Sequence, residues 1–194
     1  MSNDGLLRIN RAIHELSLAL WGGGAVFFSY LTTPRIFGFL RDRLPQAPPP
    51  GVEGLTAEVG RRLAGDTVGA VFPTYFAAQI VVGLFAAGSG IWLAWHGNKF
   101  DKIRAGLVLA AFLIVTVHSL TVYPHSVQIL DSHYEKIAAG DMATATALRQ
   151  SFGAWHGVSQ LLNLVTIVQV IVALVMVTAS ESRHRIGSQE DCLK

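Results

Sequence analysis

The stretch RQSFGAWHGVSQLLN, residues 149–163, decides the fold, because it opens an apolar segment that carries no charged residue from Gln150 to about Ala179. A helix of about 20 apolar residues spans the hydrocarbon core of a bilayer, so this segment predicts a transmembrane helix. Polar side chains recur along it every three or four residues and therefore share one helix face. These residues are His156, Ser159 or Gln160, Asn163, Thr166 and Gln169.

Polar groups that face lipid cost several kcal/mol, so we expect this polar face to point into a helix bundle. Two interpretations stay open. In the first, the polar face hydrogen-bonds a neighbouring helix, at about 1 kcal/mol or less per contact. In the second, the end that carries His156 forms a ligand or cofactor site, because ionisable groups inside membranes mark functional sites.

The preceding sequence predicts the helix that packs against this one. Gly140-Asp141 is typical of a helix C-cap followed by a helix N-cap, so the residues on either side of it should form an antiparallel hairpin. Residues equidistant from the turn then meet. The predicted pairs are His125 with His156 and His118 with Asn163. This arrangement requires that Pro124 kinks the helix without ending it.

The composition indicates a multi-pass membrane protein. Of the 194 residues, 51% are hydrophobic and only 14% are charged, and the mean hydropathy is +0.42, which is too apolar for most soluble domains. The formal charge of +2 and the scattered basic residues argue against a nucleic-acid partner. A single cysteine, Cys192, excludes an internal disulfide and a cysteine-based metal site. The acidic N-terminus, with no small-residue cleavage pattern after it, predicts no cleaved signal peptide.

Four apolar segments predict an all-α fold, an integral membrane four-helix bundle whose last two helices form a long antiparallel hairpin. The first three segments cover about 13–33, 77–95 and 103–122, and the third continues beyond the membrane as one arm of the hairpin. We expect the transmembrane domain to span 13–180, between an N-terminal tail at 1–12 and a polar C-terminal tail at 181–194.

The predicted connection between the first two helices, residues 34–71, contains three consecutive prolines at 48–50. Helical spacing of apolar residues follows them, which is consistent with an amphipathic helix on the membrane surface or a loop helix packed on the bundle. The apolar positions are Leu55, Val59, Leu63 and Val68.

Four crossings place both termini on one side of the membrane. Of the 15 lysines and arginines, eight then lie on the side of the termini and seven on the other, and the first set is concentrated in short segments. The positive-inside bias therefore predicts cytoplasmic termini, in the cell inner membrane. The zone of His118, His125 and His156 then lies near the outer face.

Histidines are the candidate ligands, because the chain has no phosphate-binding loop, dinucleotide fingerprint or nucleophile motif. His14 lies inside the first helix, before the glycine run WGGGA at 21–25. Its imidazole can ligate haem iron, with the glycines making room for the porphyrin, or can hydrogen-bond a neighbouring helix. A bis-histidine pair with His96, at the same predicted depth, is a further option.

The outer zone of the last two helices is the second candidate site. His125 and His156, together with His118 or Asn163, have the donor types that copper or zinc takes, although no carboxylate or thiolate lies at their depth. The tyrosines and Arg149 suit instead a pocket for a small anionic or aromatic ligand. The predicted pocket comprises Tyr75, His118, Tyr123, His125, Arg149, His156 and Asn163. We expect His156→Ala to perturb function or stability more than His133→Ala.

Several segments resemble the signature segments of the transmembrane protein 205-like family over about residues 10–180. They are FPTYF at 72–76, YPH at 123–125, LRQSF at 148–152, HGVS at 156–159 and NL at 163–164, with His14 and WG at 21–22 in the first helix. Tyr123 and His125 stand where related members have an acidic residue and an arginine around the proline, which argues against a charge pair there. The resemblance implies a four-helix integral membrane protein without a settled activity.

The first helix alone is also similar to the opening helix of bacterial haem-binding, four-helix protoporphyrinogen oxidases. The similarity rests on His14, WG at 21–22 and PRIF at 34–37, and it implies a haem-binding role for the histidine. Two functions therefore stay open. The first is a non-enzymatic membrane protein that binds a small ligand or serves as an accessory subunit, packing against other subunits or a second copy. The second is a haem- or metal-dependent membrane redox enzyme.

Overall fold

The computed structural model describes the backbone of residues 3–48, 54 and 56–191 and the side chains of residues 5–48, 54 and 56–177. Every regular element in this part of the chain is helical. The elements form four rods, each long and apolar enough to cross a membrane: Gly5–Arg43, Ala57–His96, Lys99–Ala138 and Met142–Val177. The predicted all-α fold with four membrane helices is therefore confirmed.

Each rod consists of one or more consecutive helical elements. The first rod contains α1 (Asn3–Val26), the π-helical turn η1 (Phe27–Thr32), α2 (Thr33–Phe37) and the π-helical turn η2 (Gly38–Arg43). The second rod is α3 (Ala57–His96). The third contains α4 (Lys99–Val117), the π-helical turn η3 (His118–Val122) and α5 (Tyr123–Ala138), and the fourth is α6 (Met142–Asp191).

Two of the three π-helical turns in the described residues precede a proline that lies within a rod. Pro34 follows η1 and Pro124 follows η3, whereas Pro45 lies beyond the end of the first rod and Pro73 lies inside α3 without a π-helical turn. A proline ring collides with the carbonyl four residues earlier and offers no N–H, and a wider turn before it relieves both problems without ending the helix. Pro124 thus continues its rod, as predicted. Pro34 also continues its rod, whereas the sequence pattern predicted that the first helix ends there.

The predicted connection 34–71 is shorter in the structure, because residues 34–43 extend the first rod and α3 begins at Ala57. The predicted amphipathic helix is the beginning of α3. Of its predicted apolar positions, Val68 is buried and Val59 and Leu63 are exposed, and Gly60 and Ala64 complete the buried face. A Cβ on Gly60 would collide with the carbonyl of Leu40, so glycine allows α3 to lie directly on η2. Leu55 lies outside the described residues.

Short, capped turns join the rods. Asn98 accepts from the backbone N–H groups of Phe100 and Asp101, and Asp101 accepts from the Asn98 N–H, which completes a capping box between α3 and α4. Gly140 adopts φ +78° after α5, and Asp141 Oδ1 accepts from the Thr144 N–H at 3.1 Å at the start of α6. Both predicted turns are confirmed.

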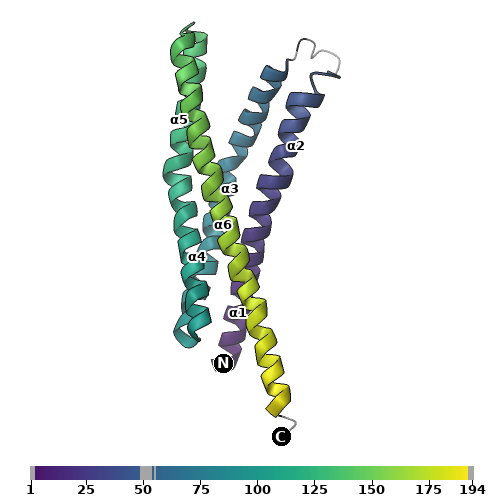
Figure 1. Cartoon of the computed structure of the whole chain (residues 1–194), viewed down its shortest axis with the longest axis vertical. Coiled ribbons are helices and arrows are strands. Elements are labelled where there is room, and N and C mark those ends of the chain that lie inside the picture. The colour runs from purple at the N-terminus through teal and green to yellow at the C-terminus, as the bar shows by residue number, and fades with distance from the viewer. Residues whose placement is uncertain (1–2, 49–53, 55, 192–194) are drawn as a thin grey trace.

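Figure 1 shows the arrangement of the rods. The start of α1, the α3–α4 turn and the end of α6 lie at one end, which we call the terminus end. The 44–56 connection and the α5–α6 turn lie at the other, which we call the tip end. Toward the tip end, the pair formed by the first rod and α3 diverges from the pair formed by α5 and α6 (Figure 1). Helix extends into both segments that were predicted as tails. In the 1–12 segment α1 starts at Asn3, and in the 181–194 segment α6 runs to Asp191.

The apolar core lies where all four rods meet. Leu18, Trp21, Val108 and Val170 are at most 2% exposed and form its largest fully buried apolar side chains. Gly83 of α3 lets the helices approach closely. A Cβ on Gly83 would lie 2.8 Å from the Phe112 ring and 3.2 Å from the Trp21 ring.

Candidate functional site

The centre of the bundle holds a hydrogen-bond network that joins the first rod, α3 and α6. Asn163 Nδ2 donates to Ser29 Oγ at 2.9 Å, and the Tyr75 hydroxyl donates to Asn163 Oδ1 at 3.4 Å. Nearby, Trp21 Nε1 donates to Gln79 Oε1 at 3.0 Å. The structure therefore brings two of the predicted pocket residues, Tyr75 and Asn163, into contact. These bonds give polar groups partners where water is excluded.

His118 joins the same region through α6 and an aromatic neighbour. It is 4% exposed, and its Nε2 lies 2.6 Å from Ser159 Oγ. Its ring meets the Phe76 ring edge-on, with 4.9 Å between centroids. Phe76 also contacts the ring of Tyr123, whose hydroxyl donates to the Gly69 carbonyl at 3.1 Å. His118 and Tyr123 therefore both lie in the packed centre, as predicted.

Six aromatic rings meet at this level, and we call them the aromatic cluster. They are Phe28, Phe72, Tyr75, Phe76, His118 and Tyr123. The tightest pair is Phe28 of η1 stacked on Tyr75 of α3, at 4.3 Å between centroids. Stacked and edge-on rings fill the space between rods. Tyr75, His118 and Asn163 thus make the helix-to-helix contacts of the first interpretation, and the cluster closes the bundle below the point where the hairpins diverge.

The remaining three predicted pocket residues lie outside this packed centre. His125 is exposed and its ring packs edge-on against Trp155, with 4.7 Å between centroids. His156 is also exposed, stacks on Phe152 of its own helix and lies with Nε2 3.0 Å from Gln160 Nε2. Arg149 is exposed two turns before His156. The polar face of α6 therefore divides: Asn163 and Thr166 point inward, and His156 and Gln160 do not.

The register of the α5–α6 hairpin explains part of this difference. His125 meets Trp155, one residue from the predicted partner, and His118 meets Ser159, four residues from the predicted partner. The π-helical turn η3 lies between those two levels and takes up one additional residue. His133, nearer the tip, is 7% exposed and donates from Nδ1 to the Ala145 carbonyl at 2.8 Å. For stability, burial and hydrogen bonding thus favour the opposite order from the expected one, and the comparison of the two variants stays a prediction.

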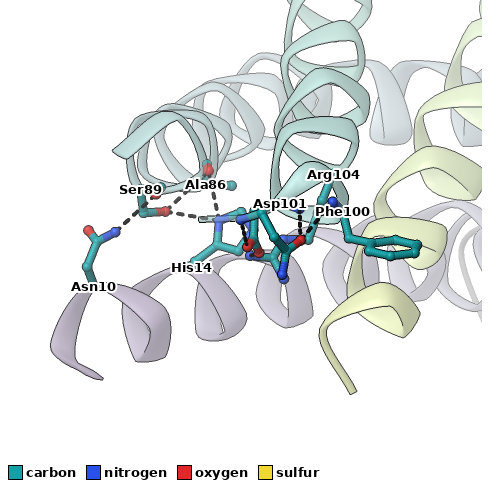
Figure 2. A network of polar contacts seen from close by, with 8 residues as sticks. Asn10, His14, Ala86, Ser89, Phe100, Asp101 and Arg104 are labelled. Carbon is teal, nitrogen blue, oxygen red and sulfur yellow. Dashed lines mark hydrogen bonds and ion pairs between the residues drawn. The ribbon is translucent and has the colours of Figure 1, made fainter. Parts of the chain in front are cut away.

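His14 belongs to a separate buried polar cluster at the terminus end (Figure 2). It is fully buried, and its Nδ1 lies 3.0 Å from the Ala86 carbonyl and 3.1 Å from Ser89 Oγ. The carbonyl accepts only, so Nδ1 carries the proton and Nε2 is the free acceptor of the ring. On α4, Arg104 is 4% exposed and pairs with Asp101 at 2.9 Å.

The surroundings of His14 do not fit a haem ligand. A Cβ on Gly90 would lie 3.0 Å from His14 Cε1, so the backbone of α3 packs directly on the imidazole. Nε2, the nitrogen that would bind iron, is buried in this packing. A Cβ on Gly23 or on Gly24 would meet no atom within 4 Å, so these glycines border open space and not the histidine ring. His96 is exposed and bonds to the Trp92 carbonyl at 2.9 Å, so it does not form a pair with His14.

The outer histidines do not form a metal site either. Among the residues whose side chains are described, no three histidine, cysteine, aspartate or glutamate side chains converge at distances that could hold a metal ion. His125 faces Trp155 and His156 faces Gln160. A late first-row metal needs at least three such ligands for a dedicated site.

An apolar groove runs along the seam between α1 and α6 at membrane depth. Its walls include Leu18, Gly22, Gly23 and Leu31 on the first rod and Ile171 and Leu174 on α6. A second, shallow groove follows the exposed face of α5, where Tyr123 and Val127 precede the acidic Asp131 and Glu135. Of the seven predicted pocket residues, only Tyr123 lines either groove.

Sequence reasoning missed the partners that tie the network together. Ser29 and Gln79 hydrogen-bond Asn163 and Trp21, yet neither was a candidate residue. The available signal was that each is a single polar side chain within an apolar run, which in a membrane helix must find a partner. The α1–α6 groove was missed because a groove depends on how two distant segments cross.

Comparison with known proteins assigns a family. No curated protein and no solved structure matches the chain. A family model described as "Domain of unknown function (DUF4149)" matches residues 16–135, which is more than half of the 194 residues and runs from α1 into α5. The match includes Trp21, the aromatic cluster and Tyr123 and ends before α6. The chain therefore belongs to the DUF4149 family.

Proposed function

We propose that this protein is a non-enzymatic membrane protein that binds a small amphipathic ligand between its two hairpins, on the tip-end side of the aromatic cluster. The observation that carries the proposal is the pair His156 and Gln160. Both side chains are exposed, hydrogen-bond each other on their own helix and lie within the apolar part of α6. Polar groups that face lipid cost free energy, so we expect the His156–Gln160 pair to have a polar partner at this depth.

The place of this pair in the fold supports a ligand as that partner. Asn163 lies two turns further along α6 and contacts Ser29, which marks the level where α6 and the first rod meet. Toward the tip end the two hairpins diverge (Figure 1). α6 packs on α1, but it has no comparable contact with η1, α2 or η2 in the described part of the chain. A ligand there would rest on the aromatic cluster and reach His156 and Gln160 from the side.

The proposal keeps the non-enzymatic hypothesis and gives the predicted pocket residues two different roles. Tyr75, His118, Tyr123 and Asn163 close the floor, and His156 contacts the ligand, with Arg149 further out. The buried state of His14 is the reason to prefer ligand binding to haem chemistry. The resemblance to the transmembrane protein 205-like family supports the four-helix membrane architecture that this proposal requires. In this proposal the termini are cytoplasmic, in the cell inner membrane, and service as an accessory subunit is compatible with ligand binding.

Native mass spectrometry of the full chain, purified in a mild detergent, tests the proposal. We expect the wild type to carry a bound non-protein mass that is strongly reduced in the double variant His156→Leu/Gln160→Leu. His125→Leu is the matched control, because His125 is also an exposed histidine but packs on Trp155. It should retain the bound mass.

Two outcomes contradict the proposal. One is a wild-type chain that carries no bound mass under conditions in which the fold is intact by circular dichroism. The other is a bound mass that His125→Leu and the double variant reduce to the same extent, because the ligand would then have no specific relation to the His156–Gln160 pair.

A further inference from the structure

We propose that the ligand is a single phospholipid with an anionic headgroup, whose acyl chain lies in the α1–α6 groove and whose phosphate is held by Arg35 and His156. This inference rests on the proposed function and specifies the chemical class of its ligand: the headgroup lies on the tip-end side of the aromatic cluster, and the acyl chain continues past the cluster along the seam between α1 and α6. It is carried by three features of the structure: the dimensions of the groove, the register between the first rod and α6, and the position of a cation at the tip-end limit of the groove.

The groove has the length and chemistry of an acyl-chain site. It follows the first rod from Leu18 to Leu31, a rise of about 20 Å at roughly 1.5 Å per residue. One leaflet accounts for about half of the roughly 30 Å hydrocarbon core, so the groove holds a chain that extends from one leaflet to the bilayer centre. Gly22 and Gly23 form its floor on α1. Ile171 and Leu174 form its wall on α6.

Two contacts fix the register between α6 and the first rod. Asn163 bonds to Ser29, and a Cβ on Gly22 would lie 3.3 Å from Val170 Cγ1. The two contacts are separated by seven residues on each segment, so the antiparallel segments keep one register between them. Continued through η1, whose π-helical turn takes up one additional residue, this register places Arg35 within about one residue of the level of Gly157, next to His156, and Gln160 near the level of Thr32. The polar pair therefore lies just beyond Leu31, where the groove ends.

The polar pair and the groove share one face of α6. His156 and Leu174 are eighteen residues apart, which is five helical turns, and Gln160 and Ile171 are eleven apart, close to three turns. On the first rod, Arg35 follows Leu31 by one turn and is exposed. A molecule that enters the groove with its tail thus meets Gln160, then His156 and Arg35. That order matches the acyl chain, ester carbonyls and phosphate of a phospholipid.

Charge and space favour an anionic headgroup over a zwitterionic one. Arginine binds phosphate oxygens through charge-assisted hydrogen bonds, and a histidine N–H adds a donor. A zwitterionic lipid carries its own cation next to the phosphate, which weakens its attraction to Arg35. Arg35, His156 and Gln160 are all exposed, so a headgroup can approach their side chains. A helix from a second copy is the other conceivable occupant of an apolar seam, but it offers no partner for Arg35, His156 and Gln160 together.

Glycine variants test the groove without disturbing the core. A Cβ on Gly23 or on Gly24 would meet no atom within 4 Å, so leucine fits at both positions. Only Gly23 lines the groove. In nanodiscs of phosphatidylcholine with a minor fraction of phosphatidylglycerol, we expect native mass spectrometry to show phosphatidylglycerol retained by wild type and by Gly24→Leu. Gly23→Leu should lose it, because the new side chain occupies the acyl-chain position.

Arg35→Gln tests the headgroup contact. A basic residue near anionic lipid contributes about 1 kcal/mol, so we expect the preference for phosphatidylglycerol over phosphatidylcholine to fall about fivefold. Retention of phosphatidylglycerol by Gly23→Leu, or an unchanged preference in Arg35→Gln, overturns the lipid assignment. So does a wild-type dimer that Gly23→Leu converts to a monomer, because the groove would then hold a second copy.

The two proposals fail in different ways. If the double variant His156→Leu/Gln160→Leu loses a bound mass that is not a phospholipid, the lipid assignment falls and the ligand-binding function stands. If no variant and no wild-type sample carries any bound mass, both proposals fall.

Discussion

His118 and His156 lie on neighbouring rods of the same hairpin, yet only His118 points into the bundle. His118 is 4% exposed and contacts Ser159, whereas His156 is exposed and contacts only its own helix. At 100° per residue, His156 points within about 20° of Asn163 around α6, so the helical period does not separate the two residues. Their exposure differs because Asn163 meets Ser29 of the first rod, whereas His156 lies nearer the tip end, where the hairpins diverge.

The consequence for stability can be measured with two alanine variants. His133→Ala should lower the free energy of unfolding by about 1–3 kcal/mol, because it removes a buried side chain and leaves the Ala145 carbonyl without its N–H donor. His156→Ala should change it by less than about 0.5 kcal/mol in ligand-free protein, because the side chain is exposed. Thermal unfolding in delipidating detergent compares them. A larger loss for His156→Ala would show that this histidine packs within the bundle.

Glycine residues of α3 show how much a single methyl group matters at a helix crossing. Gly83→Val should destabilise the protein by about 1–3 kcal/mol, because its Cβ would lie within 3.2 Å of the Trp21 and Phe112 rings. Gly88→Val on the same helix is the control, since a Cβ there meets no atom within 4 Å. The midpoint of thermal unfolding distinguishes the variants. Equal midpoints would mean that α1, α3 and α4 do not cross at Gly83.

At the scale of elements, hairpin turns could be predicted and helix ends could not. Capping chemistry is local, so Gly140-Asp141 and Asn98 with Asp101 identify their turns directly. Pro34 suggested a helix end, but η1 absorbs its steric demand and the rod continues to Arg43. Whether a proline ends the helix or is accommodated by a π-helical turn depends on packing against α3. No local sequence pattern reports that packing. The same packing selects Gly60 and Ala64, not Val59 and Leu63, as the buried face.

The α5–α6 turn has a pH dependence with a definite sign. Hydrogen bonds from the Thr144 side chain and backbone N–H lower the pKa of Asp141 below its ordinary value of 3.8. A carboxylate with a depressed folded-state pKa stabilises the fold above its unfolded-state pKa, and this contribution is lost as the pH falls through the folded-state pKa. Above about pH 5 the cap is therefore complete.

Hydrogen exchange of the first turn of α6 checks this sign. After correction for intrinsic rates, protection of residues 142–146 should fall in the wild type when the pH drops below about 4. Asp141→Asn keeps a cap oxygen but does not titrate, so its protection should be lower than that of wild type at neutral pH and should not fall further in acid. A variant that retains the full acid transition would show that another group causes it.

At the scale of the whole molecule, the two hairpins meet in the membrane and separate at the tip end, and no sequence pattern predicts that divergence. Composition and hydropathy suffice for four membrane helices, because each rod must be apolar over about 20 residues. The angle between hairpins depends instead on a few contacts. They include Tyr123 with Gly69 and Arg62 over the Tyr134 ring at 4.3 Å, all between α3 and α5. The exposure of His156 and the α1–α6 groove follow from that angle.

The orientation of this divergent end decides which leaflet supplies a lipid to the groove. Lys99 and Lys102 lie in the first turn of α4, next to the short α3–α4 turn at the terminus end, where the basic start of α1 also lies, and short basic segments favour the cytoplasmic side. In a Cys192→Ser background, Lys99→Cys in intact cells should therefore resist a membrane-impermeant maleimide, and Gln46→Cys at the tip end should react. The reverse pattern of reactivity would mean that the tip end is cytoplasmic. The lipid site would then lie in the cytoplasmic leaflet. Equal reactivity at both positions would contradict the membrane crossing itself, because four spanning rods require the two turns to lie on opposite sides.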